Sequence, residues 1–110
     1  MVDESRVAAL REVLEQNPND AFARYALGLE YSGAGDTEAA LAEFGQLLAV
    51  HPNYTNGYFM AAQTLDRAGR LSEAREMLLK GIESARQSND RHAQSEMEAM
   101  LDDFEAREQN

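Results

Sequence analysis

Hydrophobic residues in this chain recur at spacings of three and four, the period of an α-helix with one buried face. The first such segment covers residues 3–16, and its hydrophobic face consists of Val7, Leu10, Val13 and Leu14. Acidic residues at positions 3 and 4 favour the beginning of a helix, and Asn17-Pro18 ends it because proline restricts the residue before it. The pattern therefore predicts an amphipathic helix in this segment.

Similar patterns predict four further helices, over residues 20–32, 37–50, 53–68 and 71–87. Gly35 and Gly69 mark the turns inside two helix pairs, and Ser88-Asn89-Asp90 supplies a stop followed by a new N-cap. The last helix carries one hydrophobic stripe made of Ala93, Met97, Met100, Leu101 and Phe104. Because β-branched residues are few, the chain is predicted to be all-α, with about six antiparallel helices.

Two parts of the chain repeat each other at an offset of 34 residues. The recurring pairs are Pro18-Asn19 and Pro52-Asn53, Ala34 and Ala68, Gly35 and Gly69, and Ala40 and Ala74. A period of about 34 residues is one helix–turn–helix unit, which must stack on a neighbour to bury its apolar face. Binding by a helical surface is therefore the leading interpretation of function.

The first unit contains Arg24-x-x-Leu27-Gly28-x-x-Tyr31, then Ala40-x-x-x-Phe44, then Pro52. This set resembles the tetratricopeptide repeat (TPR) pattern, with Arg24 where the pattern favours Trp. The second unit is looser, and Arg86 stands where the closing Pro would fall. The resemblance, to small bacterial TPR proteins, implies a single-domain α-solenoid. Its expected parts are a partial repeat helix in residues 1–17, repeat one in 18–51, repeat two in 52–87 and a capping helix in 88–110.

Small residues occupy the positions where helices should approach closely. Gly28 and Ala62 share one position of the repeat, and small side chains there allow close packing of adjacent helices. We expect Gly28→Leu to overpack this contact and Gly28→Ala to be mild. The methionines of the last helix are interpreted as core packing that caps the stack, in preference to a Met-rich binding surface.

Composition narrows the class of partner. The net charge is −10, and five of the ten basic residues lie in the second repeat. An acidic chain without a basic stripe is not expected to bind nucleic acid or an anionic membrane. The acidity either aids solubility or steers the protein toward a basic partner. No apolar run reaches the roughly 20 residues of a membrane span, and the acidic start does not resemble a signal peptide. These features predict a cytoplasmic protein.

Candidate chemistry is sparse. The sequence has no cysteine and two histidines, His51 and His92. His51 lies at a helix end, where a structural role is favoured. His92 and Glu96 are spaced to share one helix face, but no further ligands complete a metal site. The sequence therefore predicts no enzyme, no cofactor and no metal. A metal-dependent enzyme using His92 and Glu96 remains the least favoured alternative.

The TPR resemblance implies that the first helix of each repeat lines a concave groove. Carried onto this sequence, the groove positions are Phe22, Tyr25, Leu29 and Gly33 from repeat one, and Asn56, Phe59, Gln63 and Arg67 from repeat two. We interpret them as a site for a peptide or partner helix, which makes the protein an interaction scaffold. The alternative is a homodimer that buries Phe22, Tyr25 and Phe59. Binding of acidic chaperone tails is disfavoured, because only Arg67 could contact an anion there.

Overall fold

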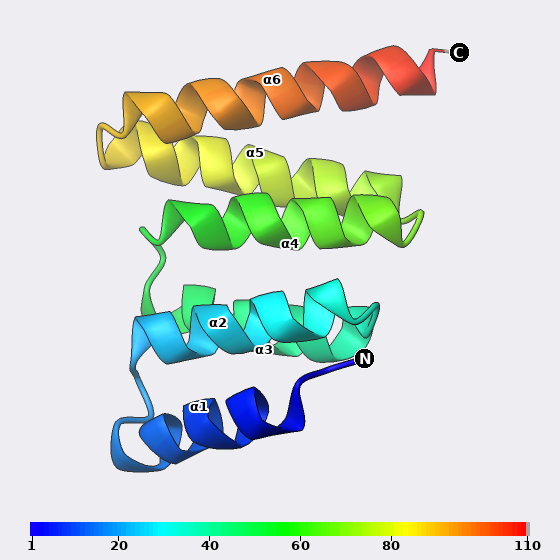
Figure 1. Ribbon diagram of the computed structural model, residues 1–110. Coiled ribbons are helices and arrows are strands. Elements are labelled where there is room, and N and C mark those ends of the chain that lie inside the picture. The colour runs from blue at the N-terminus through cyan, green and yellow to red at the C-terminus, as the bar shows by residue number, and fades with distance from the viewer. Residues whose placement is uncertain (110) are drawn as a thin grey trace. The chain divides into compact units, whose positions relative to one another are not determined.

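The computed structural model describes residues 1–109, and this part of the chain contains six α-helices and no strand (Figure 1). The helices are α1 (Glu4–Gln16), α2 (Ala21–Gly33), α3 (Thr37–Val50), α4 (Thr55–Arg67), α5 (Leu71–Gln87) and α6 (Arg91–Glu108). The all-α prediction is confirmed, with boundaries within two residues of those expected. The chain forms two compact units, residues 1–52 and residues from 53 onward.

Aspartates begin four of the six helices. Each side chain accepts a hydrogen bond from the backbone N–H three residues later, which satisfies a donor that the first turn leaves without a partner. These N-cap residues are Asp3, Asp20, Asp36 and Asp90. Tyr54 and Arg70 occupy the N-caps of α4 and α5 and make no such side-chain bond.

The predicted turns lie at residues with left-handed backbone. Gly35 and Gly69 have φ angles of 80° and 77°, and both are open enough to hold a Cβ. Glycine is favoured there because it adopts positive φ without a steric penalty. Asn89, with φ of 61°, makes the corresponding turn between α5 and α6, a conformation that asparagine tolerates better than most residues.

The first unit packs α2 against both α1 and α3. Toward α1 it contributes Ala23 and Leu27, which cluster with Leu14. Toward α3 it contributes Gly28, where a Cβ would lie 2.3 Å from Cε1 of the buried Phe44 ring. The predicted close approach at Gly28 is confirmed. The structure contradicts the expectation that Gly28→Ala is mild, because even a methyl group would overlap the buried Phe44 ring unless the ring or the helix shifts.

The second unit is built around α5, which packs on both α4 and α6. Gly81 lies where all three helices meet, since a Cβ there would be 2.5 Å from Met97 Sδ and 2.6 Å from Tyr58 Cβ. Met97 and Phe104 of α6 are almost completely buried. The stripe predicted for the last helix therefore packs on the second unit, and Met97 is core.

Candidate protein-interaction faces

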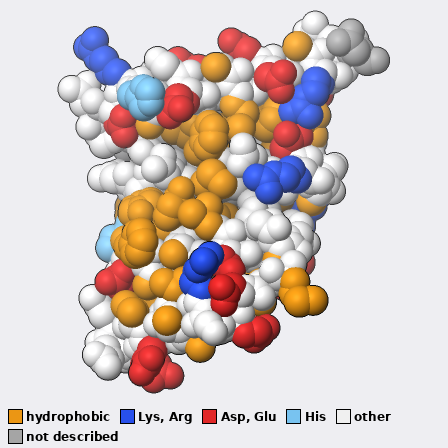
Figure 2. Space-filling view, in the orientation of Figure 1, with side chains coloured by type: hydrophobic (Ala, Val, Ile, Leu, Met, Phe, Trp, Pro, Cys, Tyr) orange, Lys and Arg blue, Asp and Glu red, His pale blue; other side chains and the backbone are white. Residues whose placement is uncertain are grey.

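Helix α2 presents an aromatic residue to solvent. Phe22 is 69% exposed, the most exposed aromatic side chain among the large hydrophobic residues of the described chain. Tyr25 and Leu29, one and two turns along the same predicted stripe, are half-buried. Hydrophobic side chains reach the surface over α2 in the space-filling view (Figure 2). An exposed phenylalanine flanked by partly exposed apolar neighbours forms a patch that a partner can cover.

Tyr25 has a double role within the first unit. Its ring centroid lies 6.3 Å from that of Phe44, with the planes tilted by 50°. That distance is within the range of favourable aromatic pairs, so Tyr25 supports the core as well as the surface. Gly33, at the end of the predicted stripe, has nothing within 4 Å of its Cβ position. The exposed part of the α2 face is thus centred on Phe22.

Helix α4 carries the other set of predicted groove residues, and this set is mainly polar. Asn56 and Arg67 are exposed, whereas Phe59 and Gln63 are half-buried. Arg67 Nη2 donates to Gln63 Oε1 at 2.8 Å, a bond between residues one helical turn apart. The Arg67 guanidinium is therefore held along the helix by a neutral amide.

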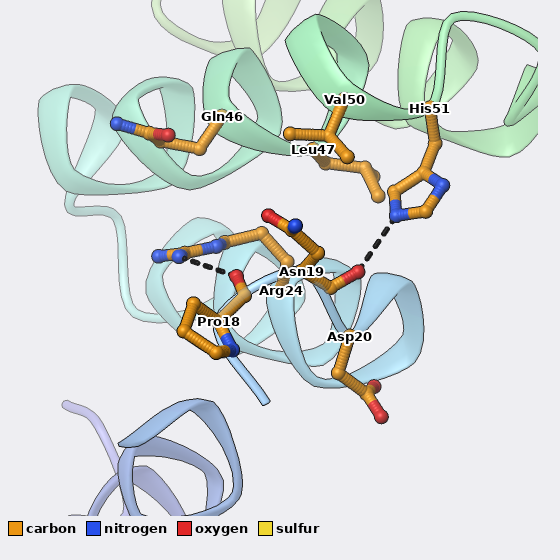
Figure 3. A pocket seen from close by; sticks show the side chains of 8 residues that line it. All are labelled: Pro18, Asn19, Asp20, Arg24, Gln46, Leu47, Val50 and His51. Carbon is orange, nitrogen blue, oxygen red and sulfur yellow. Dashed lines mark hydrogen bonds between the residues drawn. The ribbon is translucent and has the colours of Figure 1, made fainter. Parts of the chain in front are cut away.

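A small pocket, which the sequence did not predict, lies in the first unit where α2 begins and α3 ends (Figure 3). Its volume is about 160 Å³, and it is lined by Pro18, Asn19, Asp20, Arg24, Gln46, Leu47, Val50 and His51. Ligand pockets for metabolites usually measure about 300–1,000 Å³, so this one has room for a single side chain. His51 closes one wall, because its Nε2 lies 2.7 Å from the Asn19 carbonyl oxygen, to which it donates.

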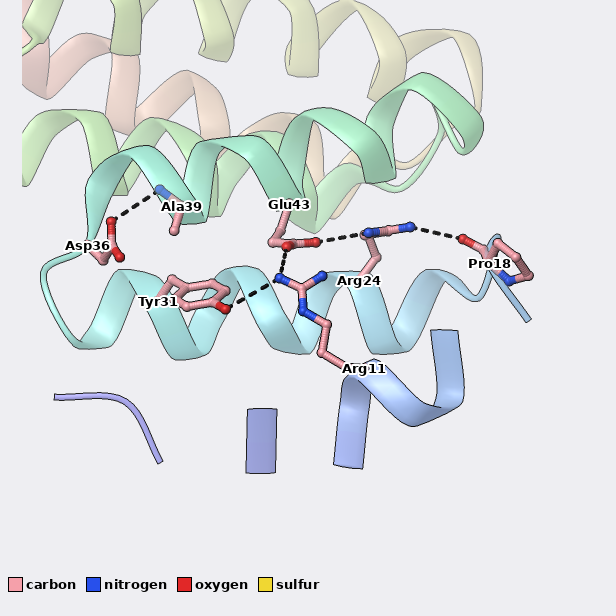
Figure 4. Close-up of polar contacts among 7 residues, drawn as sticks. All are labelled: Arg11, Pro18, Arg24, Tyr31, Asp36, Ala39 and Glu43. Carbon is pink, nitrogen blue, oxygen red and sulfur yellow. Dashed lines mark hydrogen bonds and ion pairs between the residues drawn. The ribbon is translucent and has the colours of Figure 1, made fainter. Parts of the chain in front are cut away.

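The first unit also contains a partly buried charge cluster, centred on Glu43, that the sequence did not predict (Figure 4). Glu43 is 6% exposed and accepts from two arginines, Arg24 at 3.1 Å and Arg11 through its other oxygen. Arg24 also donates to the Pro18 carbonyl at 3.2 Å. The residue that departs from the TPR pattern, Arg24 in place of Trp, is therefore compensated by a carboxylate on the facing helix.

Arg11 connects α1 to this cluster. Its Nη2 also donates to the Tyr31 hydroxyl at 3.3 Å. The hydrogen bond to Tyr31, and to a smaller extent the carboxylate of Glu43, raises the pKa of the Arg11 guanidinium above its ordinary value. Arg11 thus remains charged throughout the range in which proteins are stable. A signal was present in the sequence, since Arg24 in a position that favours Trp required a partner.

The structure adds no further ligand to the candidate metal pair of His92 and Glu96 among residues 1–109. His92 Nε2 lies 3.4 Å from Glu96 Oε1, and both side chains are largely exposed. Among residues 1–109, no three His, Cys, Asp or Glu side chains are grouped so that they could hold a metal ion. None of the helices in the described part of the chain is long and apolar enough to cross a bilayer.

Comparison with known proteins identifies related sequences. Two family models described as tetratricopeptide repeat match this chain, over residues 1–59 and 31–97. A TPR repeat-containing protein of Pseudomonas aeruginosa is 28% identical over 95 residues, which are 86% of this chain and 90% of the relative. An uncharacterized protein of Methanocaldococcus jannaschii is 33% identical over 69 residues, 63% of this chain and 80% of that protein.

Solved structures are similar as well. The solution structure of a tetratricopeptide repeat domain protein from Salinibacter ruber matches with a TM-score of 0.75 and 30% identity, covering 82% of this chain and 91% of that one. The solution structure of a protein from Bordetella parapertussis matches with a TM-score of 0.79 and 25% identity, covering 93% and 88% respectively. The helical repeat fold predicted from the sequence is thereby confirmed.

Proposed function

Because this chain belongs to the tetratricopeptide repeat family, whose domains generally mediate protein–protein interaction, we propose that it is a non-catalytic interaction scaffold. It binds a peptide or partner helix on the exposed faces of α2 and α4, which are the first helices of repeat one and repeat two. The binding residues are Phe22, Tyr25 and Leu29 on α2, and Asn56, Phe59, Gln63 and Arg67 on α4.

The observation that carries this proposal is the exposure of Phe22. A phenylalanine that is 69% exposed leaves most of its apolar surface in water, which is unfavourable by about 25 cal/mol for each Å². Aromatic anchors that enter a partner's pocket dominate the energetics of many interfaces. The polar α4 face, with Arg67 and Asn56 exposed, adds hydrogen-bonding capacity and supports selectivity for the partner.

The test compares two exposed hydrophobic residues. The full chain is used as bait in extracts of its source cells, as the unchanged protein, as Phe22→Ala and as Leu79→Ala. Leu79 is 50% exposed on α5 and serves as the matched control. We expect Phe22→Ala to change the free energy of unfolding by less than about 0.5 kcal/mol and to weaken capture of a partner at least tenfold, while Leu79→Ala captures it normally.

Equal capture by both variants would show that the α2 face does not bind. Sedimentation of the same variants tests the homodimer: a dimer lost only in Phe22→Ala would favour self-association through this face. Non-catalytic action and a cytoplasmic location stay predictions. Neither is needed for the binding experiment.

A further inference from the structure

Helix α1 is anchored less deeply than any other helix of the described chain. Leu14 is its single buried residue, whereas each other helix buries at least three. Val7 and Leu10 are partly buried against α2 and complete its apolar contact. An isolated helix of 13 residues is marginal in water. Segments with few buried contacts open locally at lower free energy than the core does.

The seat of α1 on the first unit combines an apolar strip with two carboxylates. The strip is formed by Ala23, Leu27 and Tyr31 of α2. At one end Glu30, whose side chain is only 15% exposed, binds Arg6 at 3.1 Å. At the other end Glu43 receives Arg11, as described above.

The side chains of α1 are complementary to this surface: its arginines meet the two carboxylates, and its aliphatic residues meet the apolar strip. Arg6 and Arg11 bracket the apolar residues Val7 and Leu10, and Leu14 follows one turn later. The matching pattern is Arg-Φ-x-x-Φ-Arg-x-x-Φ, where Φ is an aliphatic residue. Charge complementarity of this kind selects both the partner and its register.

The charged residues under α1 also allow this helix to leave at low cost. If α1 leaves, Glu43 keeps its bond to Arg24, because the two arginines bind different carboxylate oxygens. Glu30, whose side chain is 15% exposed while α1 is in place, becomes hydrated when α1 leaves. Departure of α1 therefore leaves no buried charge without a partner, the situation that makes such departures costly elsewhere.

We propose that the face of α2 and α3 covered by α1 is a second interaction surface, and that its ligand is a partner helix carrying two arginines around an aliphatic strip. Helix α1 occupies this surface in the free protein and competes with the partner helix. The surface is separate from the Phe22 face, so it stands or falls independently of the proposed function.

The experiment loosens α1 in the full chain and offers the site a helix of known sequence. The probe is a fluorescent peptide with the sequence of residues 1–17, measured by anisotropy. Leu10→Asp places a charge against the apolar strip and leaves every seat residue unchanged. Val13→Asp makes the same change on α1 at a side chain that is 44% exposed, and is the control.

We expect the Leu10→Asp chain to bind the peptide at least tenfold more tightly than the unchanged chain or the Val13→Asp chain. A peptide with Arg6→Gln and Arg11→Gln should bind the loosened chain at least tenfold more weakly, and added salt should weaken the arginine peptide selectively. Adding Phe22→Ala to the loosened chain should leave peptide binding unchanged, which separates this surface from the one proposed above.

Three results would overturn the proposal. The glutamine peptide binding equally well would mean an unselective apolar face, and self-association of the loosened chain that blocks the peptide would assign the face to a second copy. Native-state hydrogen exchange on the unchanged chain tests the opening itself, even if Leu10→Asp fails to fold. We expect α1 amides to exchange hydrogen at least tenfold faster than those of α3. Equal protection of the two helices would show that α1 does not open and cannot be replaced by a partner helix.

Discussion

The two units use the same repeat register and stabilise it by different means. In the first unit Arg24 and Glu43 form a buried ion pair between α2 and α3. The equivalent positions 34 residues later hold Tyr58, which is buried, and Met77, which is half-buried. The same register thus holds an ion pair in the first unit and an uncharged tyrosine and methionine in the second, and the described residues leave no buried polar side-chain atom unsatisfied.

The two terminal helices differ in the same way: α1 depends on ion pairs and α6 on apolar burial. Helix α1 is held by one buried side chain and by arginine bonds to Glu30 and Glu43. Helix α6 buries Met97 and Phe104 and adds surface pairs such as Arg107 with Asp66 at 3.0 Å. Apolar burial is insensitive to salt, whereas exposed ion pairs are screened. Because α1 depends on its ion pairs more than α6 does, added salt is expected to loosen α1 before α6.

The largest effect is expected at Phe104, which is 1% exposed. Phe104→Ala should reduce the free energy of unfolding by about 3–5 kcal/mol, because it leaves a cavity among α6 and its neighbours. Leu14→Ala in α1 should cost about 2 kcal/mol, since a shallower site relaxes more readily. Urea denaturation of both variants measures the difference. A larger loss for Leu14→Ala would reverse the ranking of the two terminal helices.

A second variant tests the closest helix approach in the first unit. Gly28→Ala should cost about 1–3 kcal/mol, because its methyl group overlaps the Phe44 ring at 2.3 Å. At the equivalent position of the second unit, Ala62→Gly should cost about 1–2 kcal/mol, through lower helix propensity and the loss of a fully buried methyl group. Thermal unfolding of the two variants compares the sites. If Gly28→Ala stabilised the protein, the Phe44 ring would have room to move.

An exchange of residues between units tests whether the charge pair and the apolar pair are equivalent. Arg24→Tyr and Glu43→Met should each cost about 1–3 kcal/mol alone, because each leaves a charged partner behind. The double variant should recover the part of that loss that comes from Arg24, whereas Arg11 still lacks the Glu43 carboxylate. Its stability should also depend less on salt than that of the unchanged chain. Additive losses in the double variant would show that the first unit requires the charges.

The smallest effect is expected at the helix starts. Asp36→Ala removes the side-chain bond to the Ala39 N–H and should cost about 1 kcal/mol. Arg70, at the equivalent position, makes no cap and forms a partly exposed ion pair with Glu73 at 2.7 Å. Arg70→Ala should therefore cost less than half as much. Equal losses, measured by urea denaturation, would mean that the ion pair replaces the cap.

Sequence reasoning predicted much of the fold because its signals are local. The hydrophobic period, the acidic residues at the first helix start and the Ser88-Asn89-Asp90 N-cap signal each depend on residues within one or two helical turns. The recurrence of Gly35 as Gly69 is visible in the sequence without any knowledge of packing. The resemblance to tetratricopeptide repeats then supplied how such helices pair. The stripe of α6 was equally readable, because a helix with one apolar face must bury it.

Side-chain partners across helices were not readable in this way. The sequence marked Phe22, Tyr25 and Leu29 as one stripe, but only packing separated the exposed Phe22 from Tyr25, whose ring lies against Phe44. The same limit explains the wrong expectation for Gly28→Ala. The space available to a methyl group depends on where a ring from another helix comes to rest.

What the sequence alone determined is the set of helices, their limits and the 34-residue register, because backbone hydrogen bonds and apolar periodicity act within a segment. Only the tertiary structure decided that Arg11 and Arg24 converge on Glu43. Those residues are 32 and 19 positions from Glu43. Which charged side chains meet depends on how whole helices pack. Burial of apolar surface contributes most of the free energy of that packing, and a single ion pair contributes little.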